Sequence, residues 1–227
     1  LIWYLENVFY SAAGRILSFM KTQFAEAVSE DTPVIHMGFW PGGDRDGNPF
    51  VTADTTLKVA DALRGSIIKC YYLDIRKIRR RLTFEGVDAS LQELEKKLYN
   101  NIFIPGQRTD ITQQEILETL QGIRQILIYQ HNSLFVNLVN LLINKVELFG
   151  LHFATLDIRQ DSSVHGKVLS DIASHSDALP ENYNDLTQEE KINALTGISK
   201  TIDPADFDDL LVKDTLQTVA AIKSIQH

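Results

Sequence analysis

The sequence contains only one cysteine, Cys70, among its 227 residues. A disulfide within the chain and a cysteine-based zinc site both need more than one cysteine, so both are excluded. Sparse cysteine is also typical of proteins from a reducing compartment. We therefore expect a cytoplasmic protein.

Basic residues are in the minority, because 22 Lys and Arg stand against 30 Asp and Glu, for a formal net charge of −8. This balance does not favour binding to nucleic acid or to an anionic membrane surface. No apolar run reaches membrane-spanning length, and the N-terminus lacks the basic start of a signal peptide. We expect neither a nucleic-acid partner nor a membrane partner.

The sequence also lacks an initiator methionine, since it starts at Leu1. Its length suits one large domain or part of a bigger one. We therefore expect a piece of a longer protein.

Apolar residues recur mostly at helical spacing, which predicts a mainly α chain. Long helices are expected over residues 2–28, 53–82 and 132–149. Further helix starts are predicted where a capping residue precedes an acidic residue by three positions, or where Asp precedes Pro. These starts are Ser90, Thr112, Thr187 and Asp203.

Only two segments have the pattern of strands, residues 34–40 and 152–158. Each follows helical sequence and precedes another helix, which is the unit of a parallel α/β architecture. Two short parallel strands cannot close a barrel, so the sheet would be a fragment unless other chain segments complete it.

A glycine-rich loop (residues 42–49) follows the first predicted strand, with the sequence Gly42-Gly43-Asp44-Arg45-Asp46-Gly47-Asn48-Pro49. Loops at the C-terminal ends of strands carry the chemistry of α/β enzymes, and glycine lets a backbone approach a ligand. The combination of glycines and charged residues therefore favours a ligand-binding site over a plain turn. The alternative is that Asp44 and Arg45 simply fix a sharp turn. The glycines match neither a P-loop nor a dinucleotide-binding pattern.

A second charged segment (residues 157–161, the Arg159 loop) starts within the last two residues of the second predicted strand and continues beyond it. Asp157 and Arg159 would share one face, because side chains alternate along a strand. Charged side chains at the end of an apolar strand cost folding free energy unless they form an ion pair or bind a ligand. One interpretation is an internal salt bridge, and the other is that Arg159 binds a phosphate or carboxylate. His165 follows, either as an anion ligand or acid, or as a structural residue.

Together the two loops resemble phosphoenolpyruvate carboxylases. Residues 38–52 align with the family pattern F-x-S-W-x-G-G-D-R-D-G-N-P-x-V-T, with departures at Phe39 and Pro41, and residues 150–165 align with G-[VL]-x-[LV]-x-x-[IL]-D-I-R-Q-[ED]-S-x-x-H. The flanking helices also fit. The resemblance implies that residues 1–227 are a single helical fragment of a TIM-type α/β-barrel enzyme, comprising barrel segments and surrounding helices without a complete catalytic domain.

Enzymes of this family carboxylate phosphoenolpyruvate with bicarbonate, using Mg²⁺ or Mn²⁺, and form oxaloacetate and phosphate. The resemblance implies phosphoryl transfer to bicarbonate, attack of the enolate on CO₂, an anaplerotic role for the tricarboxylic acid cycle and a homo-oligomer, a tetramer, when intact. The family's metal ligands fall outside this chain, so we expect the chain alone to bind no metal and to be inactive. The alternative is a helical anion-binding or protein-interaction domain without catalysis.

The resemblance also assigns roles to individual residues. Arg159 matches the arginine expected to contact the substrate phosphate, and Trp40 matches the tryptophan expected beside the substrate methylene. The expected catalytic residues are Arg159, Arg45, Asp44 and Asp46, and the expected substrate-binding residues are Trp40, Gly42, Gly43, Asn48, Arg159, Gln160 and His165. Val164 departs from the family, which often has Arg there, and so removes one cation.

Overall fold

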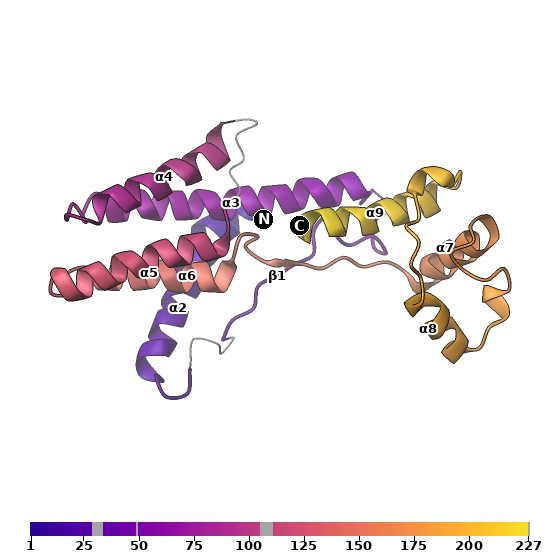
Figure 1. Ribbon diagram of the computed structural model, residues 1–227, viewed down its shortest axis with the longest axis horizontal. Coiled ribbons are helices and arrows are strands. Elements are labelled where there is room, and N and C mark those ends of the chain that lie inside the picture. Colours follow the sequence, from indigo (N-terminus) through magenta and orange to yellow (C-terminus); the bar gives the residue numbers. More distant parts are fainter. Residues whose placement is uncertain (29–33, 49, 105–110, 227) are drawn as a thin grey trace. The chain divides into compact units, whose positions relative to one another are not determined.

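The computed structural model describes residues 1–28, 34–48, 50–104 and 111–226 (Figure 1). It is mainly helical with two short parallel strands, which confirms that part of the predicted fold class. The elements are α1 (Ile2–Tyr4), the π-helix η1 (Leu5–Phe9), α2 (Tyr10–Gln23), β1 (Gly38–Phe39), α3 (Ala53–Arg79), α4 (Asp88–Phe103), α5 (Gln113–Gln130), α6 (Val136–Phe149), β2 (Thr155–Leu156), α7 (Ser162–His175), the 3₁₀ turn η2 (Tyr183–Asp185), α8 (Gln188–Thr196), the 3₁₀ turn η3 (Pro204–Asp206) and α9 (Leu210–Gln226).

The chain forms two compact units. Unit 1 comprises Leu1–Phe39 and Asp61–Thr155, and unit 2 comprises Trp40–Ala60 and Leu156–His227. The assignment of the whole chain to one barrel fragment stays a prediction. None of the described helices is long and apolar enough to cross a membrane.

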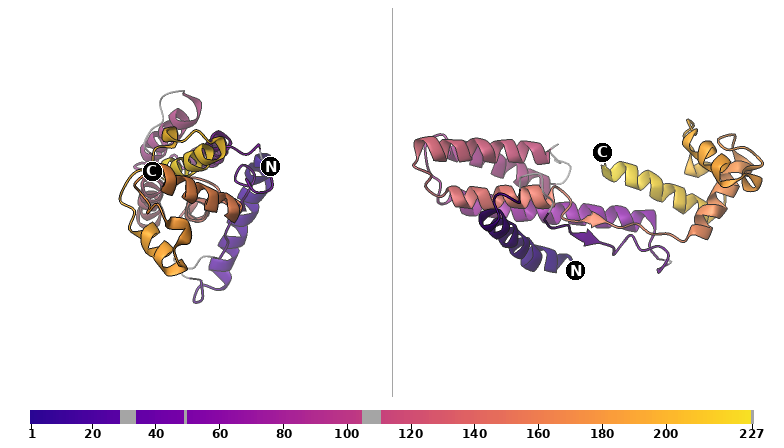
Figure 2. Two further views of the ribbon diagram at one scale, coloured as in Figure 1. Left: turned by 90° about the vertical axis from the view of Figure 1, so that its right-hand side faces the viewer. Right: turned by 90° about the horizontal axis from the view of Figure 1, so that it is seen from below.

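Unit 1 is a helical assembly in which α5 packs against both α4 and α6, and α6 packs against α2. Figure 2 shows α5 and α6 side by side from a second direction. Apolar side chains recur along one face of each helix and are buried between them, as amphipathic helices require. The largest fully buried ones include Leu63, Ile67, Tyr71, Ile75, Leu91, Leu98, Ile116, Leu120 and Ile123.

A buried polar group interrupts this core, because Lys145 is only 6% exposed. Its Nζ donates to Asp74 Oδ2 at 2.7 Å and lies 4.1 Å from the centre of the Tyr10 ring. Tyr10 Oη donates to the same carboxylate oxygen at 2.8 Å. Burial raises the pKa of Tyr10, and the Asp74 charge adds to this. The lysine charge is therefore compensated, as a buried charge must be.

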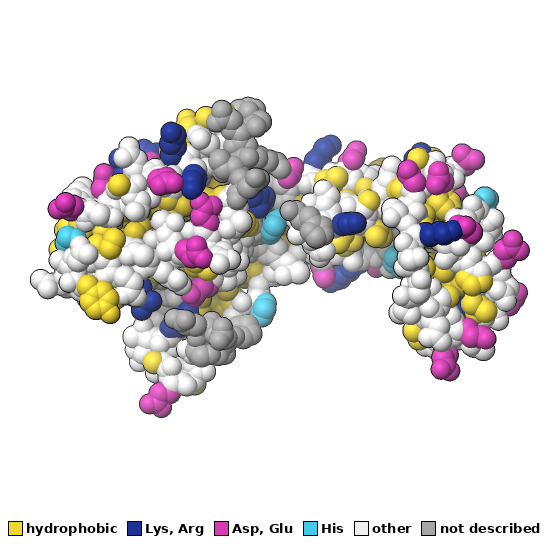
Figure 3. All heavy atoms as spheres, viewed as in Figure 1, with side chains coloured by type: hydrophobic (Ala, Val, Ile, Leu, Met, Phe, Trp, Pro, Cys, Tyr) yellow, Lys and Arg dark blue, Asp and Glu magenta, His cyan; other side chains and the backbone are white. Residues whose placement is uncertain are grey.

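The N-terminal helical segment also exposes a row of large apolar side chains, Trp3, Tyr4, Val8, Phe9, Ile16 and Phe19. Figure 3 shows hydrophobic side chains reaching the surface on the face drawn. The segment therefore buries only part of its apolar surface within unit 1.

Unit 2 has its own apolar core, formed by Val168, Ile172, Ala173, Leu179, Tyr183, Phe207 and Val212. Val164, where the sequence departs from the family pattern, packs against this core. An apolar side chain at this position is thus explained by packing.

Both strands are shorter than the predicted segments 34–40 and 152–158. Thr155 N–H donates to Met37 C=O at 2.9 Å, but a turn closed by Gly43 N–H and Trp40 C=O at 2.9 Å ends the first strand. Phe153 has a φ of 65°, so extended backbone cannot begin before it. Pairing resumes beyond the turn as an isolated parallel bridge between Asp44 and Arg159.

Capping predicted three of the four proposed helix starts. Thr112 and Thr187 accept hydrogen bonds from the backbone N–H groups of Glu115 and Glu190, and Asp203 caps η3. The prediction at Ser90 was wrong, because α4 begins at Asp88, after a turn in which Gly86 has a φ of 79°.

The predicted helix boundaries 2–28, 53–82 and 132–149 were too wide. The corresponding helices end at Gln23 and Arg79, and α6 begins at Val136. In the last case Asn132, Ser133 and Phe135 all have positive φ, which an α-helix does not permit. Hydrophobic periodicity located these helices but not their ends.

Cys70 is expected to resist alkylation in the folded chain. Its side chain is buried in unit 1, and burial is the main cause that raises the pKa of the thiol to about 12. Because the thiolate is the nucleophile, labelling by iodoacetamide at pH 8 should be at least about 100-fold slower than in urea-unfolded protein. A mass-spectrometric time course measures this ratio. Equal rates in the two states would contradict the buried position.

Candidate functional site

The glycine-rich loop and the Arg159 loop lie side by side in unit 2. Arg45 N–H donates to Arg159 C=O at 3.0 Å, and Arg159 N–H donates to Gly43 C=O at 2.8 Å. These two hydrogen bonds flank the parallel bridge between Asp44 and Arg159. The structure thus brings together two segments that the sequence places more than a hundred residues apart. Pro49, the last residue of the glycine-rich loop, lies outside the described residues.

Two glycines permit this close approach. A Cβ atom on Gly43 would lie 2.0 Å from Asp157 C=O, which is backbone and cannot rotate away. Gly42 has a φ of +87°, and a Cβ there would lie 2.5 Å from a Val59 methyl. Gly42 C=O also accepts a hydrogen bond from Thr56 Oγ1 at 2.8 Å. Both glycines are therefore needed for the backbone path of the loop.

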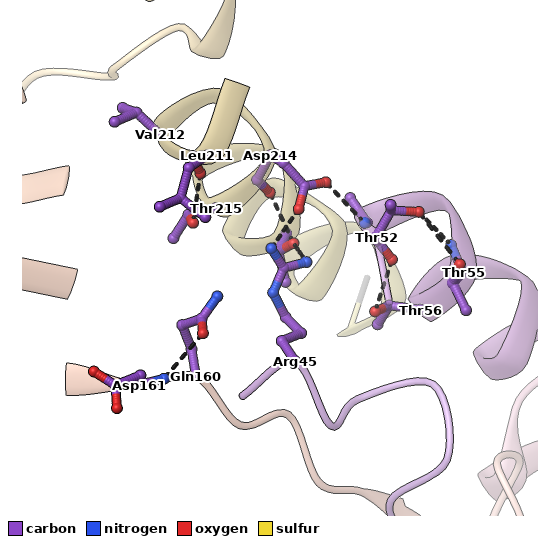
Figure 4. A network of polar contacts seen from close by, with 12 residues as sticks. Arg45, Thr52, Thr55, Thr56, Gln160, Asp161, Leu211, Val212, Asp214 and Thr215 are labelled. Carbon is purple, nitrogen blue, oxygen red and sulfur yellow. Dashed lines mark hydrogen bonds and ion pairs between the residues drawn. The ribbon is translucent and has the colours of Figure 1, made fainter. Parts of the chain in front are cut away.

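Arg45 points into unit 2 toward α9 (Figure 4). Its side chain is only 4% exposed and forms an ion pair with Asp214 Oδ2. Its Nη1 donates to Thr218 Oγ1 at 2.6 Å. The other oxygen of Asp214 accepts the backbone N–H of Ala53 at 3.2 Å. One carboxylate of α9 thus holds both the glycine-rich loop and the start of α3.

Arg159 differs from Arg45, because its side chain is 53% exposed. Its Nη2 and Nε donate to Asp157 Oδ2 at 2.6 Å and 3.1 Å. The hydrogen bonds to Asp157 are the main cause that raises the pKa of Arg159, and the charges of Asp44 and Asp46 add to it. The guanidinium is therefore a solvent-facing cation surrounded by carboxylates.

Asp44 and Asp46 are close enough to influence each other's protonation. A hydrogen bond with Asp46 is the main cause that raises the pKa of Asp44, while the Arg159 charge lowers it. Two like charges at short range disfavour full ionisation of both groups. These acids therefore form one charge cluster with Arg159, whereas Arg45 pairs elsewhere.

The other predicted site residues lie on the same two loops or just beyond them. The Trp40 side chain is exposed, at 56%. Asn48 Oδ1 accepts Phe50 N–H at 3.0 Å, and Gln160 Oε1 accepts Asp161 N–H at 2.9 Å. His165 is an exposed residue of α7. Asn48 and Gln160 therefore shape their own loops, and Trp40 and His165 face solvent.

Sequence reasoning missed Asp214 and Thr218 altogether. Both lie in the middle of α9, on a helical stretch without any motif. Thr218 shows no unusual spacing, and its hydroxyl also donates to Asp214 C=O at 2.8 Å. A buried arginine always requires a partner, but the sequence does not reveal which acid provides it.

Both interpretations of the charged loops find support in this geometry. Arg45 is tied down, as expected of a residue that fixes a turn. Arg159 makes the internal salt bridge with Asp157, yet it keeps the exposure that an anion ligand would need.

The described residues contain no group of three or more His, Cys, Asp or Glu side chains that could hold a metal ion. The carboxylates nearest Arg159 interact with its positive charge, which disfavours a cation beside them. The residues that the structure describes therefore do not fit the divalent cation that the family resemblance implies.

The comparison with known proteins agrees with the two motifs. A family model described as phosphoenolpyruvate carboxylase matches residues 2–104 and 88–227. The chain is 26% identical over 203 residues to a phosphoenolpyruvate carboxylase of Shewanella halifaxensis, covering 75% of this chain and 23% of that protein. It is 27% identical over 233 residues to one of Shewanella sediminis, covering 86% and 26%. The chain thus spans about a quarter of the length of these relatives.

Proposed function

Because this chain belongs to the phosphoenolpyruvate carboxylase family, as its two loop motifs predicted, we propose that it forms part of an enzyme that carboxylates phosphoenolpyruvate. The products would be oxaloacetate and phosphate, and the second substrate would be bicarbonate. The observation that carries the proposal is the exposed guanidinium of Arg159, on a backbone that is hydrogen-bonded to the glycine-rich loop.

Arg159 would bind the phosphate of the substrate. Its planar guanidinium can donate two parallel hydrogen bonds to phosphate oxygens, which is the geometry that arginine provides best. In the structure this edge of the guanidinium binds Asp157. Substrate binding would therefore exchange one anionic partner for another, and Asp157 would orient the arginine until then.

The remaining loop residues would shape the pocket around that phosphate. Asp44 and Asp46 would keep the Arg159 side chain in position through their charges. Trp40 would offer an apolar wall beside the substrate methylene, which would protect the enolate from protonation by water. Gly42, Gly43, Asn48, Gln160 and His165 would complete the two loops around the substrate.

Arg45 would act as a positioning residue in this arrangement. Its burial and its contacts with Asp214 and Thr218 support a role in fixing the loop's conformation in place of contact with substrate. The bridge between its neighbour Asp44 and Arg159 would then transmit that conformation to the phosphate-binding arginine.

We also propose that β1 and β2 are neighbouring strands of a TIM-type barrel, with the two loops at their C-terminal ends, where such barrels place their active sites. The family's divalent cation would be bound by residues beyond those described here. Cytoplasmic location and a homo-oligomeric, tetrameric assembly are the further expectations for the intact enzyme.

Removal of the Arg159 guanidinium tests this function. In the polypeptide encoded by the complete reading frame, Arg159→Gln should lower kcat/KM for phosphoenolpyruvate by about 100-fold or more, because a preorganised donor to the reacting phosphate is lost. Reduction of the oxaloacetate formed, coupled to NADH oxidation, measures the rate. Arg159→Lys should recover only part of the lost activity, because lysine keeps the positive charge but cannot donate two parallel hydrogen bonds to the phosphate.

Arg76→Gln is the matched control. Arg76 is an exposed arginine of α3 whose Nε lies 3.6 Å from Glu95, and its loss should leave kcat/KM unchanged. Turnover by the Arg159→Gln variant at the parent rate would contradict the proposal. Phosphate binding without any carboxylation by the complete polypeptide would favour the alternative, an anion-binding domain without catalysis.

A further inference from the structure

We propose that unit 1 contains a second anion-binding site, separate in its residues from the two loops, that accepts a small amphipathic phosphate or carboxylate. The site is a pocket of about 370 Å³ between the C-terminal part of α3, the two arginines that follow it, and α6. Its volume lies within the range of small-molecule sites. The inference does not depend on the proposed carboxylation.

The pocket is strongly basic in a chain whose net charge is −8. Its lining includes four cations, Lys77, Arg80, Arg81 and Lys145, and one carboxylate, Asp74, for a formal charge of +3. A concentration of positive charge in a concave surface raises the local concentration of anions. The pocket therefore attracts anions, although the net negative charge of the whole chain disfavours them elsewhere.

The single carboxylate does not cancel this charge. Asp74 Oδ2 accepts hydrogen bonds from buried Lys145 at 2.7 Å and from Tyr10, and Asp74 Oδ1 lies 3.4 Å from Lys77 Nζ. Asp74 is thus fully occupied by groups within unit 1. Asp74 offsets only one of the two lysine charges, so the charges of Arg80, Arg81 and one lysine remain.

Both arginines are exposed and available to a ligand. Among the residues that the structure describes, neither guanidinium forms a side-chain hydrogen bond or an ion pair. The neighbouring Arg79 differs, since it donates to Asp88 at 3.2 Å and to Glu95 at 2.8 Å. Two free guanidinium groups on consecutive residues offer several donors in the fork geometry that suits phosphate or carboxylate.

The rest of the lining is apolar and comes from Ile78, Leu138, Leu141 and Leu142. Ile78 and Leu142 are buried, so this surface is rigid core and not a loose loop. An inorganic anion would leave it uncovered. A ligand with an anionic head and a short apolar chain or ring would contact the arginines and cover the leucines together.

Titration of the 227-residue chain with alkyl phosphates tests the site. Hexyl phosphate should bind about tenfold or more tightly than methyl phosphate, because the apolar lining covers the longer chain. The double variant Arg80→Gln/Arg81→Gln should weaken hexyl phosphate binding by about tenfold or more, because its charged hydrogen bonds are lost. Hexanoate is titrated in parallel to compare a carboxylate head group with a phosphate. Isothermal titration calorimetry gives the Kd of each ligand.

Three further variants distinguish binding in this pocket from binding elsewhere on the chain. Arg15→Gln removes an exposed arginine of α2 and should leave the Kd unchanged. Arg159→Gln should also leave it unchanged, so a failure of the proposed phosphate role of Arg159 does not affect this test. Leu138→Ser should reduce the preference for hexyl over methyl phosphate without altering the binding of methyl phosphate.

The arginines to be replaced are solvent-exposed, so the double variant should keep its helical circular dichroism. Hexyl phosphate binding of equal strength in the parent chain and the double variant would overturn the proposal. Loss of binding in Arg159→Gln alone would do the same, since it would place the ligand at the two loops. Stronger binding of hexanoate than of hexyl phosphate would identify the preferred head group as a carboxylate within the same site.

Discussion

Asp214→Ala is expected to lower the free energy of unfolding of unit 2 by about 3 kcal/mol, because it leaves a buried arginine charge without a partner. Arg45 is 4% exposed at its side chain, and Asp214 is its ion-pair partner. The same substitution removes the acceptor for Ala53 N–H at the start of α3. Asp214→Ala therefore affects both a buried charge and a helix start.

Native-state hydrogen exchange of the amides in residues 42–48 and in α9 measures this loss of stability locally. Urea unfolding measures the change in the free energy of global unfolding. Asp214→Asn keeps an acceptor for Ala53 N–H but removes the charge. It should therefore lower the free energy of unfolding by less than Asp214→Ala does. Asp177→Ala is the matched control, because Asp177 forms an ion pair with Lys200 at the surface, where both side chains are mostly exposed. It should leave exchange in the loop unchanged.

The double variant Arg45→Met/Asp214→Leu distinguishes a lost charge partner from lost packing. Replacement of both members of a buried pair by apolar residues is often close to neutral. The double variant should therefore be more stable than Asp214→Ala, although Ala53 N–H still lacks its acceptor. An Asp214→Ala protein as stable as the parent would show that Arg45 is not held by this carboxylate.

Gly43→Ala is expected to separate the two loops. The added Cβ would lie 2.0 Å from Asp157 C=O, and only a shift of backbone can relieve such a contact. The shift would break or lengthen the hydrogen bonds that join Gly43 and Arg45 to Arg159. We expect a loss of stability of about 2–3 kcal/mol, at the upper end for one inserted methyl group.

The amide protons of Arg45 and Arg159 report on this change, because both are donors between the loops. Their exchange should become faster in Gly43→Ala, and in the complete enzyme the rate of carboxylation should fall with it. Gly166→Ala is the control, since a Cβ on this α7 glycine meets no atom within 4 Å. Alanine in that helix should be neutral or slightly stabilising. Unchanged exchange at Arg159 in Gly43→Ala would contradict the predicted separation.

Helices and loop motifs could be predicted from the sequence because their signals are local. The apolar stripe of α5 and the capping residue Thr112 lie within a few turns of each other. Strand lengths could not be predicted as well. The turn after Phe39 and the positive φ of Phe153 are backbone conformations that the apolar pattern of these segments does not encode.

The same contrast between local and long-range signals applies to the ion-pair partners of Arg159 and Arg45. Arg159 pairs with Asp157 two residues away, and alternation along the chain predicted that pair as one of two interpretations. Arg45 pairs with a residue 169 positions away, and no pattern in either segment indicates the other. Its burial was also unexpected, because a polar loop sequence gives no measure of which side chain turns inward.

The long separation between Arg45 and Asp214 sets an order of events during synthesis. The ribosome completes residues 40–60 long before it reaches Asp214, 169 residues beyond Arg45. Until α9 is made, the arginine must stay in water, and the nascent loop has no anchor at this point. The buried contacts of the Arg45 side chain can therefore form only late, after the α9 segment of the growing polypeptide has left the exit tunnel.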